Sequence, residues 1–331
     1  MERIELSADE ALANSKANPS RHWFSGNNSP KERLASGEPM TVYHWPKFKL
    51  DPSWPVFTIG SCFARNVETA LLKNDVPLVT NGFGHPPQRF DSWNEEAKTG
   101  GGVKVGQLSR GALNKYTTHS MRIEVERALK GLPLEREGLM EMAEDKWFDP
   151  HSGGLKLTDF ETATDNRLRI AEATRQALKA KVSFITLGLT ETWIDVSNEV
   201  PMNHPPFAYL HRRKELFRFV DFEYEEVVAQ LRAMIDMLKE AVPEMLFIVT
   251  VSPVPHSTFK MQDALVSVTG AKSVLRAAAE RLYRTLDYVD YFPSYEIVMN
   301  TPRHKAFLDD QLHVKPPLID HAIGQFMKSY Y

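Results

Sequence analysis

Short apolar runs alternate with longer amphipathic segments along most of this chain. Runs rich in β-branched and aromatic residues are typical of buried strands, and they fall at 55–60, 182–188, 245–251 and 288–292. Segments with helical periodicity fall at 63–73, 121–130, 160–179, 224–241, 271–286 and 316–330. Strands that alternate with helices indicate βαβ units. The pattern therefore predicts an α/β fold in which helices cover both faces of a central parallel sheet.

Two stretches lack this alternation. Residues 1–50 are expected to form an arm that packs on the body through its aromatic side chains, which are Trp23, Phe24, Tyr43 and Trp45. The main domain is expected at 51–331, with an irregular insertion at about 82–180. The insertion begins with a Gly-, Pro- and Asn-rich segment. That segment contains neither a dinucleotide-binding fingerprint nor a phosphate-binding loop.

Composition narrows the class of protein. The 331 residues carry a net charge of −3, from 40 Lys and Arg against 43 Asp and Glu. This balance gives no electrostatic reason to expect nucleic acid or a membrane as a partner. The longest apolar runs are far shorter than the ~20 residues of a membrane-spanning helix, and the polar N-terminus does not resemble a secretory signal. Cys62 is the only cysteine, so no intrachain disulfide can form, and we expect a cytoplasmic protein.

The most informative position is Cys62, two residues beyond the glycine that ends the first predicted strand. Ligands of parallel α/β sheets bind beyond the carboxyl ends of the strands. A sharp strand-to-helix turn exposes a nucleophile there, and the N–H groups of a helix N-terminus lower a thiol pKa and stabilise an oxyanion. A small buried core residue is the alternative interpretation. Ser61 is the competing nucleophile, since it would point outward if Cys62 pointed into the core.

A candidate general base lies near the other end of the chain. Asp310 and His313 are three residues apart in a short turn before the last predicted helix. The carboxylate is placed to hold one ring nitrogen of the imidazole while the other faces a nucleophile, as in catalytic triads. A solvated acidic turn with a surface histidine is the alternative.

These two features bring a known family into view. The run Gly60-Ser61-Cys62-Phe63-Ala64 spells the motif after which the GSCFA family is named, and the chain resembles that family over about residues 55–315. The resemblance continues in the same order through residues 113–118, 186–193, 251–255, 291–296 and 310–313.

The GSCFA family is similar to the SGNH/GDSL hydrolases. The resemblance therefore implies a flavodoxin-like (SGNH-hydrolase-like) three-layer fold with a central parallel sheet. In those hydrolases a G-D-S motif supplies the nucleophilic serine. Here Gly60 matches the glycine, Ser61 stands at the aspartate and Cys62 stands at the serine, while Asp310 and His313 match the D-x-x-H motif of the same enzymes.

The sequence departs from that pattern at the oxyanion block. Where the hydrolases have an asparagine after the second glycine motif, this chain has Gly188, then Thr190 and Glu191. Thr190 is one replacement donor for the oxyanion. Asn114, together with Gly111, is the other.

Further polar residues follow the second and third predicted strands. Glu191 is expected either to bind a hydroxyl group of an acceptor or to pair with an arginine, and Trp193 is expected to pack. His256 is a second candidate base. His204 and His211 lie in a basic loop, and no metal site is expected because further ligands at suitable spacing are missing.

The sequence predicts an acyl-group enzyme, an esterase or O-acyltransferase that acts on a small-molecule or carbohydrate substrate. No cofactor is expected. An acyl donor such as acyl-CoA would suit the thioester chemistry of a thiol, and the run Arg212-Arg213-Lys214 could contact its phosphates. The alternative is a non-catalytic module that binds a glycan or a nucleotide in the same cleft. A redox-sensing thiol is a third hypothesis.

Overall fold

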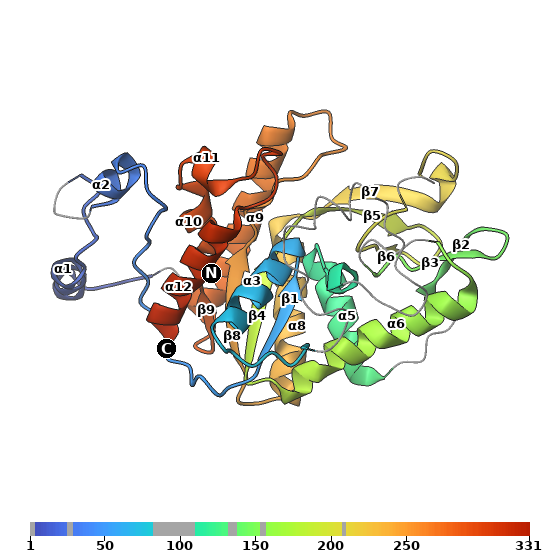
Figure 1. The fold of residues 1–331 in the computed structure, drawn as a ribbon, viewed down its shortest axis with the longest axis horizontal. Coiled ribbons are helices and arrows are strands. Elements are labelled where there is room, and N and C mark those ends of the chain that lie inside the picture. The colour runs from blue at the N-terminus through green and yellow to red at the C-terminus, as the bar shows by residue number, and fades with distance from the viewer. Residues whose placement is uncertain (1–3, 25–28, 82–109, 132–137, 153–156, 207–209) are drawn as a thin grey trace.

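The computed structural model describes residues 4–24, 29–81, 110–131, 138–152, 157–206 and 210–331. Its centre is a four-stranded parallel sheet in the order β1-β4-β8-β9 (Figure 1). The strands are β1 Val56–Gly60, β4 Val182–Leu187, β8 Leu246–Val251 and β9 Val289–Tyr291. The predicted parallel α/β sheet is confirmed, and each predicted strand is present within two residues of its expected bounds.

The strand order agrees with the flavodoxin-like type. Val56, at the start of β1, forms a parallel bridge with Leu78 on the edge of β1 that faces away from β4. Counting this bridge as a vestigial strand gives the order 2-1-3-4-5 of doubly wound flavodoxin-like sheets. The register is even, since Thr186 of β4 pairs with both Gly60 and Thr250. The carboxyl ends of three strands therefore lie level with one another.

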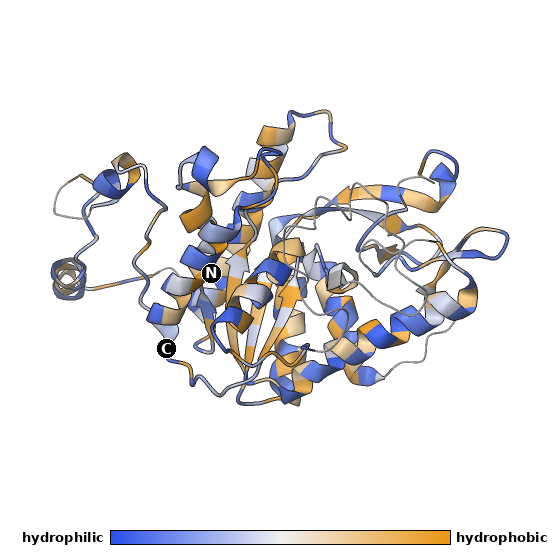
Figure 2. Cartoon of the chain, in the orientation of Figure 1, coloured by the Kyte–Doolittle hydropathy of each residue, from blue (hydrophilic) through white to orange (hydrophobic). Residues whose placement is uncertain are grey.

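Helices cover both faces of this sheet, which makes three layers. One face packs against α3 Cys62–Lys73, α10 Ser294–Met299, α11 Arg303–Ala306 and α12 Pro316–Tyr330. The other packs against α5 Thr118–Lys130, α8 Tyr224–Ala241 and α9 Ala264–Thr285. Neighbouring residues of β4 alternate between the two cores: Phe184 belongs to the first and Ile185 to the second. The central strands are buried on both sides, which explains their continuous apolar sequences (Figure 2).

A smaller β layer lies beside the main sheet. It contains the antiparallel sheet β6-β5-β7 (β5 Glu191–Asp195, β6 Val200–Pro201, β7 Phe217–Asp221) and the hairpin of β2 Met140–Ala143 and β3 Lys146–Phe148. The long helix α6 Phe160–Arg175 runs next to it and continues as the 3-10 turn η4 Gln176–Lys179 (Figure 1). Further 3-10 turns are η2 Arg110–Leu113 and η5 Lys214–Leu216. The sequence pattern did not predict these five short strands. The first part of the expected insertion, 82–109, lies outside the described residues.

The N-terminal stretch contains α1 Ala8–Ala17 and α2 Pro30–Ala35, and every residue of these two helices is at least partly exposed. The aromatic side chains expected to hold the arm stay largely exposed, with Phe24 at 78%. Contact with the body comes instead from residues 40–50, through apolar side chains such as Phe48 and Leu50 and through backbone hydrogen bonds. The Leu50 N–H donates to the Tyr330 carbonyl at 2.9 Å, and the Lys47 N–H donates to Asp290 at 3.0 Å.

Candidate functional site

The turn between β1 and α3 depends on a glycine. Gly60 ends β1 with a φ of +150°, a conformation that side chains with a Cβ rarely adopt. A β-carbon at this position would overlap the Thr186 carbonyl oxygen and lie 2.7 Å from the Thr186 β-carbon. The close approach of β1 and β4 therefore requires glycine. Ser61 then occupies the N-cap position, and α3 begins at Cys62.

A second glycine brings another segment onto the same edge. A β-carbon on Gly188, just after β4, would lie 2.7 Å from the Tyr116 carbonyl oxygen and 3.0 Å from the Ser61 β-carbon. The Lys115 N–H donates to the Gly60 carbonyl at 2.8 Å, and the Leu189 N–H donates to the Tyr116 carbonyl at 2.8 Å. Residues 114–116 thus lie across the carboxyl ends of β1 and β4, next to Ser61.

Asn203 fixes the position of Asn114, the predicted oxyanion donor. Its side-chain amide donates to the Asn114 carbonyl at 2.8 Å, and its oxygen accepts the Tyr116 N–H at 2.8 Å. The Asn114 amide itself is buried and donates to the Tyr116 hydroxyl at 3.4 Å. Asn203 was not predicted from the sequence, because its role depends on a contact across 89 residues of chain.

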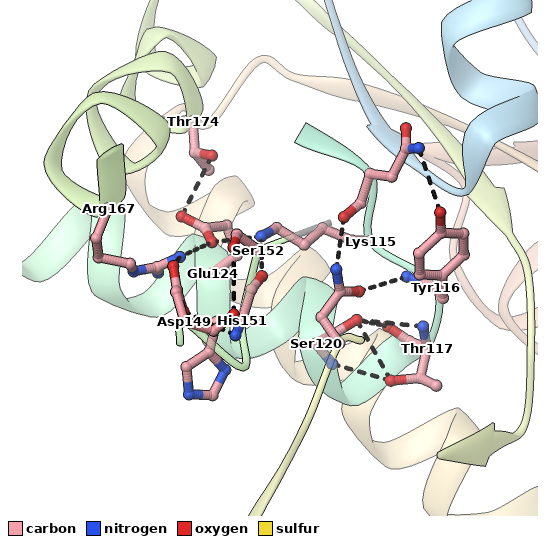
Figure 3. A network of polar contacts seen from close by, with 12 residues as sticks. Lys115, Tyr116, Thr117, Ser120, Glu124, Asp149, His151, Ser152, Arg167 and Thr174 are labelled. Atoms are coloured by element: carbon pink, nitrogen blue, oxygen red, sulfur yellow. Dashed lines mark hydrogen bonds and ion pairs between the residues drawn. The ribbon is translucent and has the colours of Figure 1, made fainter. Parts of the chain in front are cut away.

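A buried ion cluster holds Lys115 from the other side (Figure 3). The Lys115 and Arg167 side chains each lie 2.7 Å from the Glu124 carboxylate, and Asp149 lies 3.8 Å from Arg167. Burial raises the pKa of Glu124, but Arg167 and Lys115 outweigh it and bring that pKa down to about 2. Since the Lys115 backbone touches Gly60, this cluster connects α5 and α6 to the turn that holds Cys62.

The two candidate nucleophiles differ in exposure. Cys62 is half-buried, whereas Ser61 is only 3% exposed and its hydroxyl has no hydrogen-bond partner among the described residues. The Ser61 N–H is occupied by the Thr186 carbonyl at 3.2 Å. Of the N–H groups at the helix start that were expected to stabilise an oxyanion, that of Ser61 is therefore already engaged, and the accessible position of the pair is Cys62.

The expected low pKa of the thiol is also wrong. Burial raises the pKa of Cys62 above its ordinary value. The Lys272 ammonium opposes this shift, followed by the N–H groups of Phe63 and Cys62 at the start of α3 and by Arg65. The helix N-terminus acts in the expected direction, but the loss of solvent around the sulfur is the larger effect.

Lys272 is the residue of this site that the sequence analysis missed. It lies on α9, is 2% exposed, and donates a hydrogen bond of 2.6 Å to the Gly188 carbonyl. No carboxylate of the described residues pairs with it, and burial lowers its pKa to about 7 while the Cys62 charge works in the opposite direction. One sequence feature could have identified it: Lys272 occurs in the apolar stripe of its helix, between Ala271 and Leu275.

The residues after β4 have structural partners. The Thr190 hydroxyl donates to Asp221 at 2.6 Å. The buried Glu191 carboxylate accepts hydrogen bonds from Ser267 at 2.6 Å and Thr258 at 2.9 Å, and Lys260 lies 3.2 Å away. The expected arginine partner of Glu191 is replaced by these groups, which connect the loop after β8 and the first turn of α9 to β5.

His256, the second candidate base, lies in that loop. Its ring is largely buried, neither ring nitrogen has a hydrogen-bond partner within the described part of the chain, and Glu191 lies 3.8 Å away. Burial, followed by the charge of Lys272, lowers the pKa of His256, so the ring is held neutral.

Asp310 and His313 are brought together as the spacing predicts. The Asp310 carboxylate lies 2.6 Å from the His313 Nδ1 and also accepts the backbone N–H groups of Leu312 and His313. Burial raises the pKa of Asp310, but its hydrogen bonds with His313 and with the Leu312 N–H together outweigh this effect and bring the value to about 2. The pair lies between α11 and α12, and α12 packs beside α3. The approach of the imidazole to the Cys62 sulfur stays a prediction.

Two further properties follow from the described ranges. No group of three or more His, Cys, Asp or Glu side chains within them is arranged to bind a metal ion. Likewise, none of the helices in these ranges has the length and apolar character needed to cross a bilayer.

The fold and the site define a class: α/β proteins with a flavodoxin-like parallel sheet and a polar strand-to-helix turn at its carboxyl edge. The family model described as "GSCFA family" matches residues 55–326, which is most of the chain. The chain belongs to the GSCFA family. A comparison with curated proteins returned no match.

Proposed function

We propose that this protein is an acyl-group enzyme in which Cys62 is the nucleophile. The observation that supports this best is the position of Cys62, which is half-buried and is the first residue of α3. It directly follows Gly60 and Ser61, which both contact the backbone of Thr186. Its neighbour Ser61 is almost fully buried. A strand-to-helix turn of this kind exposes a nucleophile in the SGNH-like hydrolases that the family resembles.

The proposed reaction has two halves. The Cys62 thiol loses its proton to a base of the site and the sulfur attacks the carbonyl carbon of an ester or thioester, while the leaving oxygen or sulfur takes a proton from the protonated imidazole of His313. The resulting thioester is then attacked by water or by a carbohydrate hydroxyl, whose proton returns to His313, and the departing sulfur recovers its proton from the first base. Asp310 holds the imidazole in one tautomer through Nδ1. The Cys62 N–H and the side-chain amide of Asn114 are the proposed donors to the oxyanion.

The surroundings of the site support a small-molecule or carbohydrate substrate. Phe259 is more than half exposed in the loop after β8, and its ring packs edge-on against Trp193 at 5.0 Å between centroids. Such an exposed aromatic surface suits the apolar face of a sugar ring. The basic run 212–214, near the start of β7, is the proposed contact for phosphates of an acyl donor such as acyl-CoA.

Acyl labelling tests this proposal. The protein is incubated with p-nitrophenyl acetate or a short-chain acyl thioester, and the covalent adduct is measured by intact-protein mass. We expect one acyl group on the wild type and on Ser61→Ala, and none on Cys62→Ala. A label that persists in Cys62→Ala but disappears in Ser61→Ala would assign the nucleophile to Ser61 instead.

A binding module on the same fold is the second candidate. It is favoured by one observation: Thr190 and Glu191, which stand at the oxyanion block, are occupied by hydrogen bonds to Asp221, Thr258 and Ser267. This candidate predicts that the wild type takes no label from either reagent. A glycan or nucleotide would then raise its melting temperature without being consumed.

A further inference from the structure

Lys272 is a buried cation without a described acidic partner. Its side chain is 2% exposed, and its amine donates to the Gly188 carbonyl at 2.6 Å. A buried ammonium without a carboxylate is costly, so such a lysine either loses its proton or finds another anion. Elsewhere in the described chain the buried cations Lys115 and Arg167 share the carboxylate of Glu124. Lys272 differs from these two residues because no carboxylate of the described residues pairs with it.

The position of Lys272 indicates that the Cys62 thiolate is the anion with which it can pair. Gly188, which accepts its hydrogen bond, lies against Ser61, and Ser61 immediately precedes Cys62. The thiol and the amine are close enough that the charge on each acts on the other. Of the charged side chains that act on the sulfur, Lys272 has the largest effect and Arg65 a smaller one.

We infer that Lys272 is the proton partner of the Cys62 thiol. When the sulfur attacks a carbonyl carbon, the neutral amine of Lys272 takes the proton of the thiol. The S–H bond breaks and an N–H bond forms, which leaves a thiolate beside an ammonium and requires no electron donor or acceptor. The inference rests on the proposed role of Cys62 and assigns to Lys272 the first proton transfer, which leaves the Asp310–His313 pair to serve the leaving group and the acceptor.

The other groups around the pair do not replace this partner. Arg65 is bonded to Glu68 at 2.6 Å, and the Tyr116 hydroxyl, whose pKa is raised to about 12 by burial, stays protonated. Burial lowers the pKa of His256 and so holds its ring neutral. The Lys260 ammonium is paired with the Glu191 carboxylate. One helical turn further along α9, the Arg276 guanidinium is bonded to Glu280 and Glu296.

The low pKa of Lys272, about 7, supports this assignment because a base works best when its pKa lies near the working pH. At neutral pH a substantial fraction of the amine is unprotonated, while the raised pKa of the thiol keeps the sulfur protonated. The uncharged pair is therefore well populated at rest, and its charged form arises during the attack.

Alkylation of the sole cysteine tests the inference without any substrate. The rate of reaction with iodoacetamide is followed by intact-protein mass from pH 6 to pH 10.5, and the pH midpoint is compared between variants. In Lys272→Met, we expect a midpoint at least about one pH unit above that of the wild type, and a rate at pH 8 about tenfold lower. In Lys272→Arg, the fixed cation favours the thiolate, so the midpoint moves below that of the wild type.

Lys260→Met is the matched control, because Lys260 lies near the same site but pairs with Asp221 and Glu191. Its midpoint should equal that of the wild type. An unchanged midpoint in a folded Lys272→Met would overturn the inference, and so would an unchanged midpoint in Lys272→Arg if Lys272→Met fails to fold. Because alkylation needs no acyl substrate, either result leaves the acyl-labelling test of Cys62 independent.

Discussion

The backbone of Gly60 and the carbonyl oxygen of Thr186 approach so closely that no β-carbon fits between them. This contact joins the ends of two neighbouring strands and sets the direction in which the chain enters α3. The position of the site beyond this contact is consequently set by the backbone at the carboxyl edge of the sheet, from which its side chains project.

Replacing Gly60 by Ala should therefore destabilise the protein and misplace Cys62. The new methyl group meets the Thr186 backbone at a φ of +150°, and we expect a loss of about 2–5 kcal/mol in the free energy of unfolding. Denaturant titration measures this loss. Gly270→Ala is the control: nothing lies within 4 Å of a β-carbon there, and alanine in a helix should be neutral or stabilising by up to about 1 kcal/mol. Equal effects of the two substitutions would contradict the steric explanation.

The buried ion cluster should give a clear dependence of stability on pH. The pKa of Glu124 is about 2 in the folded protein, below its ordinary value of 4.5, so its contribution is complete above pH 4.5 and is lost as the pH falls towards 2. Glu124→Gln removes the charge and should cost about 3–5 kcal/mol at pH 7, because Lys115 and Arg167 lose their shared partner.

The difference between wild type and Glu124→Gln should then shrink as the pH is lowered from 4.5 to 2, as followed by thermal or urea denaturation. The control is Glu126→Gln, which removes a more exposed carboxylate of the same helix paired with Arg122 and Lys130. Its effect should stay below about 1 kcal/mol. A difference that is independent of pH would rule out the ionised carboxylate as the cause.

Asp310→Asn should separate activity from stability. The Asp310 and His313 side chains are each more than one third exposed, so the melting temperature should change little. The amide cannot hold the same imidazole tautomer, and turnover of the acyl probe should fall by about 10²–10⁴-fold. Release of p-nitrophenol by folded protein measures this. Wild-type turnover in Asp310→Asn would show that the pair has no catalytic role.

Lys272→Met should change how stability depends on alkaline pH. The pKa of Lys272 is about 7 in the folded protein against 10.5 ordinarily, so between these values the unfolded chain binds the proton that the folded one has released. This group lowers wild-type stability by its full amount below pH 7, and the penalty disappears as the pH rises towards 10.5.

The melting temperature of Lys272→Met relative to the wild type should therefore be highest at pH 7 and below, and fall by a few degrees towards pH 10. Lys239→Met serves as a comparison, since burial also lowers the pKa of Lys239, but its amine donates to the Met245 carbonyl at the amino end of β8. A Lys272→Met curve parallel to that of the wild type would mean that the folded lysine titrates normally.

The central sheet was predictable from the sequence because its strands are buried on both faces. Val182–Leu187 and Leu246–Val251 are fully or almost fully buried, so their apolar character is continuous and local. The helices α8 and α12 begin and end where the pattern predicts, since each has one long apolar face.

The small β layer was not predictable on the same grounds. Its strands have two to five residues, and Trp193 and Phe219 pair with each other across 26 positions of chain. The sequence also placed the start of α9 at 271, but the helix begins at Ala264. Its first turns expose Leu265 and Val266 and include Gly270, so they carry no amphipathic pattern.

Some residues of the candidate site were predictable from the sequence and others were not, for a similar reason. Cys62, Asp310 and His313 were identified from short motifs in which each residue is a neighbour of the next. Lys272 and Asn203 act through contacts with Gly188 and with the 114–116 segment, so nothing in their immediate sequence indicates the role. Only the lysine leaves a local trace, as a charge on the apolar side of its helix.

The side chain of Lys115 lies in the ion cluster while its N–H holds the Gly60 carbonyl, and this arrangement has a consequence for how the protein can evolve. Substitutions at outward-facing positions of α6 should have little effect on the site. The inward-facing Arg167, by contrast, is connected through Glu124 and Lys115 to the turn that holds Cys62. A relative that lost this arginine would have to exchange Glu124 and Lys115 in concert, so the three positions should be inherited as one unit.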